Sequence, residues 1–205
     1  MSGNAHLRAD LAAIAEMIPS GARVLDVGCG DGVLLEYLVR TKNVDGRGIE
    51  LSQQNVNACV ARGLAVVQGD ADTDLAEYPE QVFDFVILSQ TIQATEKPSQ
   101  VLAQLLRIGR HVAISLPNFG HWRVRLALLA GGRMPRTQAL DYSWYDTPNI
   151  HLCTLADFVD LARSQGAAID RALTLKDDQV SGDIRPGAWG PNLLAQGAIF
   201  LLRKK

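Results

Sequence analysis

A short stretch of alternating glycines, GCGDG at residues 28–32, directly follows the apolar run RVLDV. Glycines allow a backbone to turn tightly and to approach a ligand closely. Asp26 lies inside the preceding run, where a carboxylate is costly unless it faces water or a hydrogen-bond donor. A ligand ammonium would be such a donor, so the pattern is typical of a binding loop that contains an acid.

Three interpretations of this loop stay open on its residues alone. It can be an ordinary strand-to-helix turn that binds nothing. It can be a dinucleotide-binding fingerprint, although that fingerprint needs a third small residue at the position where this chain has Val33. It can also be an acidic loop for a ligand that bears an ammonium group. The third interpretation explains Asp26, and the second does not.

Two further acids follow the next two apolar runs. Glu50 stands at the end of the run 45–51 and Asp70 at the end of the run 65–70. A carboxylate in the position of Glu50 can accept hydrogen bonds from both hydroxyls of a ribose. Asp70 could accept from an adenine amino group, with the backbone N–H of Ala71 near a ring nitrogen. Either acid alone could be a solvated loop residue, but three acids after three successive strands favour one shared ligand site.

The elements that would position these residues can be predicted from hydrophobic periodicity. Seven strands are predicted, at 23–28, 45–51, 65–70, 83–89, 110–116, 167–176 and 197–203. The first five alternate with helical segments, and the last two are joined by a long polar loop. This alternation predicts an α/β fold, a Rossmann-like three-layer αβα sandwich with a mostly parallel seven-stranded sheet and an antiparallel edge hairpin. Ligands in such sheets bind at the carboxyl ends of the strands, where the glycines and acids lie.

The composition limits the class of protein. The chain has 205 residues, 47% of them hydrophobic, which predicts a single domain with a full core. A net charge of −2 and the lack of a long basic run give no reason to expect binding to nucleic acid or to membranes. Three cysteines are an odd number and favour free thiols in a reducing compartment. Because the sequence has no recognisable signal peptide or membrane span, we expect a cytoplasmic protein.

The stretches VLDVGCGDG, GIE, QGDAD and FDFVILSQTIQATEKP follow one another across residues 24–98. In these motifs the chain resembles the class I S-adenosylmethionine-dependent methyltransferases. The resemblance implies that it binds S-adenosylmethionine or its product, S-adenosylhomocysteine. Asp26 and the loop backbone would hold the methionine end, the next two acids the ribose and the adenine, and Ser89 and Gln90 would lie beside the methyl group. The residues expected to contact the cofactor are Asp26, Gly28, Cys29, Gly30, Gly32, Glu50, Leu51, Asp70, Ala71 and Ser89.

No residue is predicted to be catalytic. Methyl transfer from a sulfonium is a direct displacement that can run largely on positioning. The fourth strand ends in Ser89-Gln-Thr-Ile and not in the Asn/Asp-Pro-Pro-aromatic run of enzymes that methylate exocyclic amines, which disfavours nucleobase or glutamine-amide substrates. His121 and His151 fall in an irregular segment where a general base could sit, whereas His111 begins a strand and is expected to be structural. Ligand-type residues in that segment lack zinc-binding spacing, so no metal site is predicted.

The segment at about 117–153 interrupts the alternation and contains one expected helix, HWRVRLALLAGG. In this fold it would lie over the cofactor mouth. Residues 1–205 are therefore expected to form one methyltransferase-like domain with a lid or docking insertion. The segment closely resembles the one that marks the MetW family of methionine biosynthesis proteins, and the match runs through nearly the whole chain.

The MetW resemblance implies a role in methionine biosynthesis beside a homoserine O-acyltransferase of the MetX type. One hypothesis is an S-adenosylmethionine-binding accessory or regulatory subunit that contacts the acyltransferase through Arg123, Arg125, Trp144 and Tyr145. Aromatic residues and arginines are common anchors of interfaces, although these aromatics could equally pack the insertion onto the sheet. A second hypothesis is a methyltransferase that acts on an unidentified small molecule, and a third is a fold that binds neither.

Overall fold

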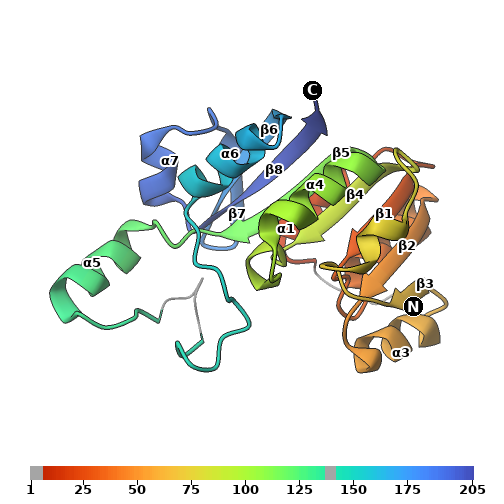
Figure 1. The fold of residues 1–205 in the computed structure, drawn as a ribbon, viewed down its shortest axis with the longest axis horizontal. Coiled ribbons are helices and arrows are strands. Elements are labelled where there is room, and N and C mark those ends of the chain that lie inside the picture. The colour runs from red at the N-terminus through yellow and green to blue at the C-terminus, as the bar shows by residue number, and fades with distance from the viewer. Residues whose placement is uncertain (1–6, 137–141) are drawn as a thin grey trace.

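The computed structural model describes residues 7–136 and 142–205 (Figure 1). Its strands are β1 (Arg23–Val27), β2 (Asp45–Glu50), β3 (Ala65–Gln68), β4 (Phe83–Ser89), β5 (Gly109–Pro117), β6 (Ala167–Lys176), β7 (Gln179–Asp183) and β8 (Gly197–Lys204). Its helices are α1 (Ala9–Met17), α2 (Val33–Lys42), α3 (Gln53–Ala61), α4 (Pro98–Ile108), α5 (Trp122–Gly131), α6 (Leu155–Ser164) and α7 (Trp189–Leu194). Two short 3₁₀ helices, η1 (Asp74–Glu77) and η2 (Ile92–Ala94), lie before and after β4.

The strands form one sheet in the order β3-β2-β1-β4-β5-β8-β6-β7. Neighbours among β1 to β5 pair in parallel, whereas β8 runs antiparallel to both β5 and β6, and β7 runs antiparallel to β6. The mostly parallel α/β sheet confirms the predicted fold class. The chain leaves β1 toward β3 on one side and continues from β4 on the other, so the strand order reverses between β1 and β4. The carboxyl ends of these two strands are therefore the expected place for a ligand.

The sheet has eight strands instead of the predicted seven, because the segment predicted as a long polar loop contains β7 as well as α7. All five residues of β7 are exposed, so no alternating hydrophobic pattern reveals this strand. Asp177 and Asp178 turn the chain from β6 into β7 with positive φ angles of 48° and 58°, the conformation of tight hairpins. The antiparallel edge hairpin is therefore β6–β7, and β8 pairs inside the sheet between β5 and β6.

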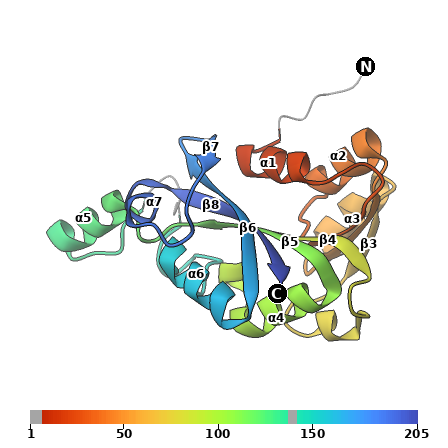
Figure 2. The same ribbon diagram turned by 90° about the horizontal axis from the view of Figure 1, so that it is seen from above.

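Apolar side chains on the two faces of the sheet pack against different helices. Val24 and Ile87 lie in a cluster with residues of α1 and α2, whereas their chain neighbours Leu25 and Val86 lie in a cluster with residues of α4 and α6. Pleated strands produce this alternation. Figure 2 shows the resulting layers, with α1 and α2 on one side of the sheet and α4 and α6 on the other. The sheet core thus holds the carboxyl ends of β1 and β4 in fixed positions.

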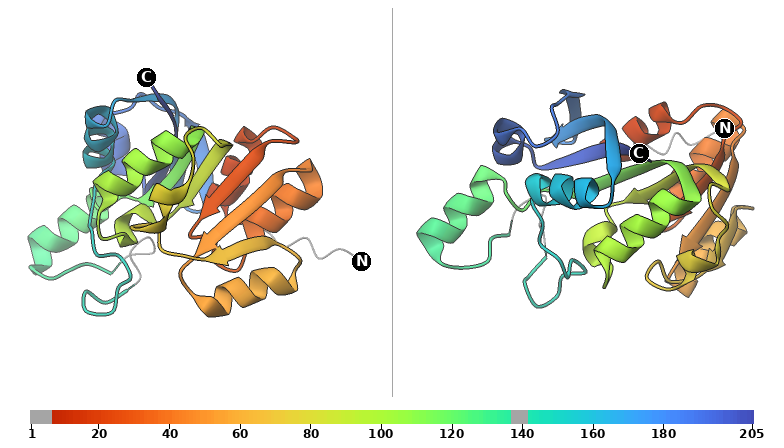
Figure 3. Two further views of the ribbon diagram at one scale, coloured as in Figure 1. Left: turned by 45° about the vertical axis from the view of Figure 1, so that its right-hand side comes forward. Right: turned by 45° about the horizontal axis from the view of Figure 1, so that its top comes forward.

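α5 projects away from these layers, as both views of Figure 3 show. Val124 is its one buried residue. The described parts of the segment that follows, 132–136 and 142–153, contain no helix or strand, and residues 137–141 of the predicted insertion lie outside the described residues. None of the helices in the described ranges has the length and apolarity that crossing a membrane requires.

Candidate functional site

The loop between β1 and α2 turns on glycines with positive φ. Gly28 and Gly32 have φ angles of 69° and 80°, a region that side chains rarely adopt. A Cβ on Gly28 would lie 2.9 Å from Thr91 Oγ1, and one on Gly32 would lie 2.6 Å from Leu64 Cδ1. The fold itself therefore requires these glycines, and the argument for a ligand rests on the side chains around them.

Asp26 lies at the end of β1, next to this loop, with only 3% of its surface exposed. Burial first, and then the charge of Glu50, raises the pKa of Asp26 to about 7, while the charge of Arg8 opposes the rise. Within the described part of the chain, no group donates a hydrogen bond to its carboxyl group. Asp26 is not among the residues with a fully buried, unpartnered side-chain atom, and it lines an open cavity where water or the ammonium group of a ligand can supply the donor that a buried carboxylate needs.

Glu50 ends β2 and fixes the glycine loop. Its Oε2 accepts from the N–H of Gly30 at 2.8 Å, and its Oε1 accepts from the N–H of Ser52 at 2.9 Å and from Asn55 Nδ2 at 3.3 Å. A carboxylate has about four acceptor sites, so the chain itself occupies three and roughly one is left. That Glu50 accepts from both ribose hydroxyls stays a prediction, and it requires one of the present hydrogen bonds to be shared or given up.

Asp70, the third acid, lies just after β3, in a turn that its own side chain caps. Asp70 Oδ1 accepts from the N–H of Asp72 at 2.8 Å. The carboxylate of Asp72 in turn accepts from the N–H groups of Glu96 and Lys97, both at 2.8 Å, which ties this turn to the start of α4. Ala71 is partly buried against the main core. Asp72 helps to position Asp70 and Ala71 by binding the start of α4. This role was not predicted, because the contact joins segments 24 residues apart in the sequence.

A cavity of about 130 Å³ lies between the glycine loop, α1 and α2. It is a small cavity that is open to solvent, and its size suits the amino-acid end of a ligand whose remainder lies outside it. Five predicted cofactor residues line it: Asp26, Gly28, Cys29, Gly30 and Ser89. The other lining residues are Arg8, Leu11, Asp31, Val33 and Leu34. The predicted residues Gly32, Glu50, Leu51, Asp70 and Ala71 lie outside this lining, and Leu51 is 66% exposed.

The cysteine of the glycine loop is a packing residue. Cys29 and Cys59 are both buried, and all three cysteines are free thiols, as predicted. Cys59 Sγ donates to the carbonyl of Gly30 at 3.3 Å. Burial, followed by the charge of Asp26, raises the pKa of the Cys29 thiol far above its ordinary value. Because the thiolate is the reactive form, Cys29 is no candidate nucleophile.

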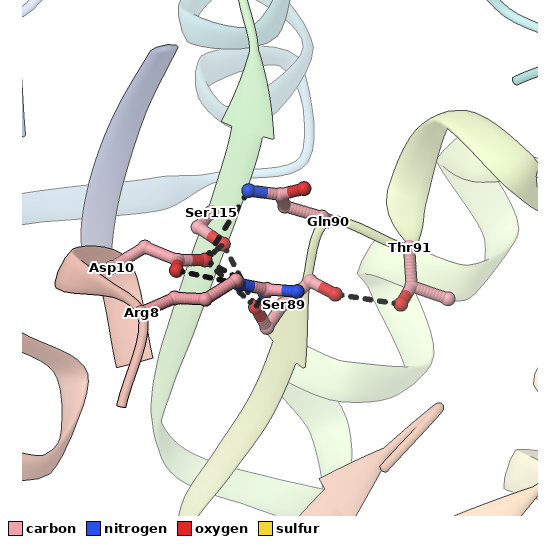
Figure 4. A network of polar contacts seen from close by, with 6 residues as sticks. All are labelled: Arg8, Asp10, Ser89, Gln90, Thr91 and Ser115. Atoms are coloured by element: carbon pink, nitrogen blue, oxygen red, sulfur yellow. Dashed lines mark hydrogen bonds and ion pairs between the residues drawn. The ribbon is translucent and has the colours of Figure 1, made fainter. Parts of the chain in front are cut away.

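A buried acid from the N-terminal helix reaches the end of β4 (Figure 4). Asp10 Oδ2 accepts from the hydroxyls of Ser89 at 3.0 Å and Ser115 at 2.9 Å, and its carboxylate pairs with Arg8. Burial raises the pKa of Asp10, but the hydrogen bond and charge of Arg8, together with the two serines, outweigh it and lower that pKa. Gln90, with a positive φ of 49°, directs Nε2 toward the same oxygen at 3.5 Å. Sequence reasoning missed Arg8, Asp10 and Ser115, because these partners are up to 105 residues apart.

Two larger cavities lie outside the glycine loop. One of about 280 Å³ shares Arg8 with the first cavity and is also lined by Asp10, Gln90 and Gln196. The other, of about 330 Å³, is lined only by insertion residues between Phe119 and Leu152. No described residue lines both the insertion cavity and the cavity of the glycine loop. The cavity of about 280 Å³, called the polar cavity below, is lined by Gln90, beside which the methyl group is expected.

None of the three histidines considered above lines the glycine-loop cavity. His111 stacks on Phe85 with 4.9 Å between ring centroids, which agrees with the structural role expected for it. His121 caps α5 by accepting from the N–H of Arg123 at 3.3 Å, and burial, followed by the charge of Arg123, lowers its pKa. The backbone N–H of His151 donates to the carbonyl of Gln93 at 2.9 Å. Within the described ranges, therefore, no histidine lines the glycine-loop cavity as a candidate general base.

Solved structures of S-adenosylmethionine-dependent methyltransferases share the fold. One from Thermotoga maritima has a TM-score of 0.66 at 17% identity and covers 96% of this chain and 88% of that chain. A putative methyltransferase of Haloferax volcanii, solved in complex with the Trm112 methyltransferase activator, has a TM-score of 0.68 at 14% identity, with 96% and 89% covered. At these identities the likeness is one of fold, and it confirms the methyltransferase-like architecture.

Sequence relatives identify the family. A bifunctional methionine biosynthesis protein MetXA/MetW of Rhodopirellula baltica is 35% identical over 208 residues, which cover 97% of this chain and 33% of the relative. A fatty-acid O-methyltransferase of Mycolicibacterium smegmatis is 36% identical over 95 residues, which cover 44% of this chain and 34% of the relative. The match therefore spans about a third of the length of each of these relatives. The family model of methionine biosynthesis protein MetW matches residues 8–202, and the chain belongs to the MetW family.

Proposed function

We propose that this chain binds S-adenosylmethionine or S-adenosylhomocysteine and acts as an accessory or regulatory subunit of a homoserine O-acyltransferase of the MetX type. The observation behind the partnership is the Rhodopirellula baltica relative, whose name combines MetXA with MetW and which matches 97% of this chain over a third of its own length. Fusion keeps two parts together at a high effective concentration. A separate MetW-type chain would need a contact surface to achieve the same association.

The cavity of the glycine loop supports the ligand half of this proposal. Asp26 lines it as a buried acid without a donor from the described chain, and a ligand ammonium would supply that donor. Glu50 and Asp70 follow the adjacent parallel strands β2 and β3. The nucleoside part of the ligand would extend from the cavity along this edge of the sheet. Calorimetry with S-adenosylmethionine tests the assignment: Asp26→Ala should abolish binding, and an unchanged affinity would contradict it.

Exposed side chains of the insertion support the proposed partnership with the acyltransferase. Trp144 and Tyr145 are 73% and 75% exposed and stack edge to face with 5.6 Å between their rings. On α5, the Arg123 guanidinium lies 5.4 Å from the ring of Trp122, which is itself 41% exposed. Exposed aromatic clusters with arginines are typical of protein interfaces. The open position of these residues favours a docking surface over a lid packed on the sheet.

The partnership is tested by measuring acyltransferase activity with and without this chain, and complex formation by co-purification. Trp144→Ala and Arg123→Ala should weaken complex formation by about tenfold or more, since interface anchors often contribute above 1.4 kcal/mol. Trp189→Ala is the matched control, because Trp189 is also 73% exposed but lies on α7, outside the insertion. Acyltransferase activity that is the same with and without the chain would refute the accessory role.

A methyltransferase acting on a small molecule is the second candidate function. The polar cavity of about 280 Å³ beside Gln90 favours it, because an acceptor there would lie near the expected methyl group. Direct displacement at a methyl group needs positioning more than a catalytic side chain. Release of S-adenosylhomocysteine that depends on a defined acceptor would establish this activity. Release at the same rate without any acceptor would count against it.

A further inference from the structure

Residues 90–97, called the bridging segment below, join the end of β4 to the start of α4 and include η2. On one side this segment contacts the wall of the proposed ligand site. Thr91 Oγ1 donates to the carbonyl of Ser89 at 2.8 Å (Figure 4), and a Cβ built on Gly28 would lie 2.9 Å from the same oxygen. Ser89 and Gly28 both line the glycine-loop cavity. The bridging segment therefore packs directly against residues of the cavity lining.

The other end of the bridging segment is bound to the turn after β3. The N–H groups of Glu96 and Lys97 donate to the carboxylate of Asp72, both at 2.8 Å. The N–H of Asp72 donates in turn to Asp70 Oδ1 at 2.8 Å. Because Asp70 is expected to bind the adenine, a ligand in the proposed site would contact this turn as well as the cavity wall. Both ends of the bridging segment are thus connected to groups that the ligand would touch.

The same segment also contacts the insertion. The backbone N–H of His151 donates to the carbonyl of Gln93 at 2.9 Å, and its ring Nε2 lies 3.4 Å from the carbonyl oxygen of Glu96. Trp144 and Tyr145, the exposed aromatics of the proposed docking surface, come shortly before His151 in the same irregular stretch. The position of this stretch therefore depends on its contact with the bridging segment.

The bridging segment carries two local costs. Gln90 has a positive φ of 49°, which residues other than glycine rarely adopt. Gln93 is 4% exposed and donates from Nε2 to the carbonyl of Gln90 at 2.8 Å, but its Oε1 is the one buried side-chain nitrogen or oxygen among the described residues without a partner. Gln93 and His151 also line a small cavity of about 10 Å³, so their contact is not close-packed. Strained residues and unpaired buried groups are typical of segments that change conformation in function.

We propose that the bridging segment couples ligand binding to partner binding: a ligand in the glycine-loop site fixes the bridging segment at both ends, which holds residues 149–153 and the docking surface in place for the acyltransferase. The inference rests on the proposed function and deepens it by naming how the ligand regulates the partner. A ligand that orders the shared segment lowers the entropy cost of the second binding step, so the coupling is positive. Reciprocity requires that the acyltransferase raise the affinity for the ligand by the same factor.

Amide hydrogen exchange of the isolated chain tests the first step. Saturating S-adenosylmethionine should slow exchange of the His151 N–H by about fivefold or more, the lower end of typical coupling factors. The exposed strand β7 is the internal control and should not change. Gln93→Met removes the hydrogen bond to Gln90 and should lose most of this slowing, yet still bind S-adenosylmethionine, because Gln93 does not line the glycine-loop cavity. Gln100→Met makes the same change at an exposed residue of α4 and should behave as the wild type.

The second step is tested by measuring the affinity of the chain for the acyltransferase with and without S-adenosylmethionine. The ligand should raise this affinity by about fivefold or more in the wild type, and by much less in Gln93→Met. If ligand and acyltransferase both bind but neither affects the other, or if the ligand lowers the affinity, the coupling is refuted while the proposed function stands. If the chain binds neither, both proposals fall. The wild-type comparisons need no variant, so they decide the matter even if thermal unfolding shows that Gln93→Met does not fold.

Discussion

At the scale of single residues, Asp26 serves two opposing requirements. A buried acid in β1 without a donor is a liability to the fold, because ionisation at that position is costly. In the proposed ligand site the same acid would receive the ammonium group of the ligand, for which the described chain supplies no hydrogen-bond donor of its own. The pKa of about 7 places the transition between these two states near neutral pH. Binding and stability should therefore respond to pH in opposite ways.

Affinity for S-adenosylmethionine is expected to depend on pH through Asp26. Its pKa of about 7 means that the carboxyl group is protonated in the free chain at lower pH and must lose that proton to receive the ammonium group. Affinity should therefore rise as the pH increases through about 7, and fall again above about 8, where an α-amino group loses its proton. Calorimetry at roughly one-unit steps between pH 5.5 and pH 9 measures this dependence of the affinity on pH. An affinity that stays constant between pH 5.5 and about pH 7.5 would show that Asp26 does not receive the ammonium group.

The stability of the ligand-free chain should change in the opposite direction. The pKa of Asp26 is raised in the folded chain from 3.8 to about 7, so its contribution to stability is present below pH 3.8 and is lost as the pH rises through about 7. Asp26→Asn keeps the shape without the charge. It should raise the free energy of unfolding at pH 8, by at most roughly 4 kcal/mol, and change it little at pH 4. Urea unfolding of the two chains at pH 4 and pH 8 measures this change. If the substitution changed the free energy of unfolding equally at both pH values, the charge of Asp26 would not be buried.

At the scale of elements, the boundary of α6 depends on the two side chains of a capping box. The hydroxyl of Thr154 accepts from the N–H of Asp157 at 3.2 Å, and Asp157 Oδ2 accepts from the N–H of Thr154 at 2.9 Å. Thr154→Ala should lower the free energy of unfolding by about 1 kcal/mol. Ser164→Ala, at the other end of the helix, should have a smaller effect. Urea unfolding compares the two, and equal losses would mean that the cap is not the cause.

Elements were predictable where their pattern is local in the sequence. The parallel strands and the glycine loop can each be recognised within about ten residues, through apolar runs or glycine spacing. β7 could not be found, because its five residues are all exposed and its place is set by pairing with β6. Asp10 could not be found either. Its burial depends on Ser89 and Ser115, which only the folded sheet brings to it.

At the scale of the whole molecule, the ligand cavity and the exposed insertion occupy separate regions. The cavity of the glycine loop is formed by β1, α1, α2 and β4, while α5 stands clear of the layers (Figure 1). A lid of an enzyme would be expected to share lining residues with the cofactor cavity. Apart from Pro117, which lines the cavity beside Gln90, the described insertion residues line neither that cavity nor the cavity of the glycine loop, and this favours a surface that meets another protein.

Two exposed leucines on α5 provide the sharpest test of this arrangement. Leu126 and Leu129 are 53% and 86% exposed, so they contribute little to the core. The double change Leu126→Gln/Leu129→Gln should alter the free energy of unfolding by less than about 1 kcal/mol. It should nevertheless weaken binding to the acyltransferase by about tenfold, because an interface loses buried apolar area. Val60→Gln, at a residue 56% exposed on α3, is the control and should leave binding unchanged. Acyltransferase affinity that is equal for the double variant and the wild type would exclude α5 from the contact surface, whatever the other insertion residues do.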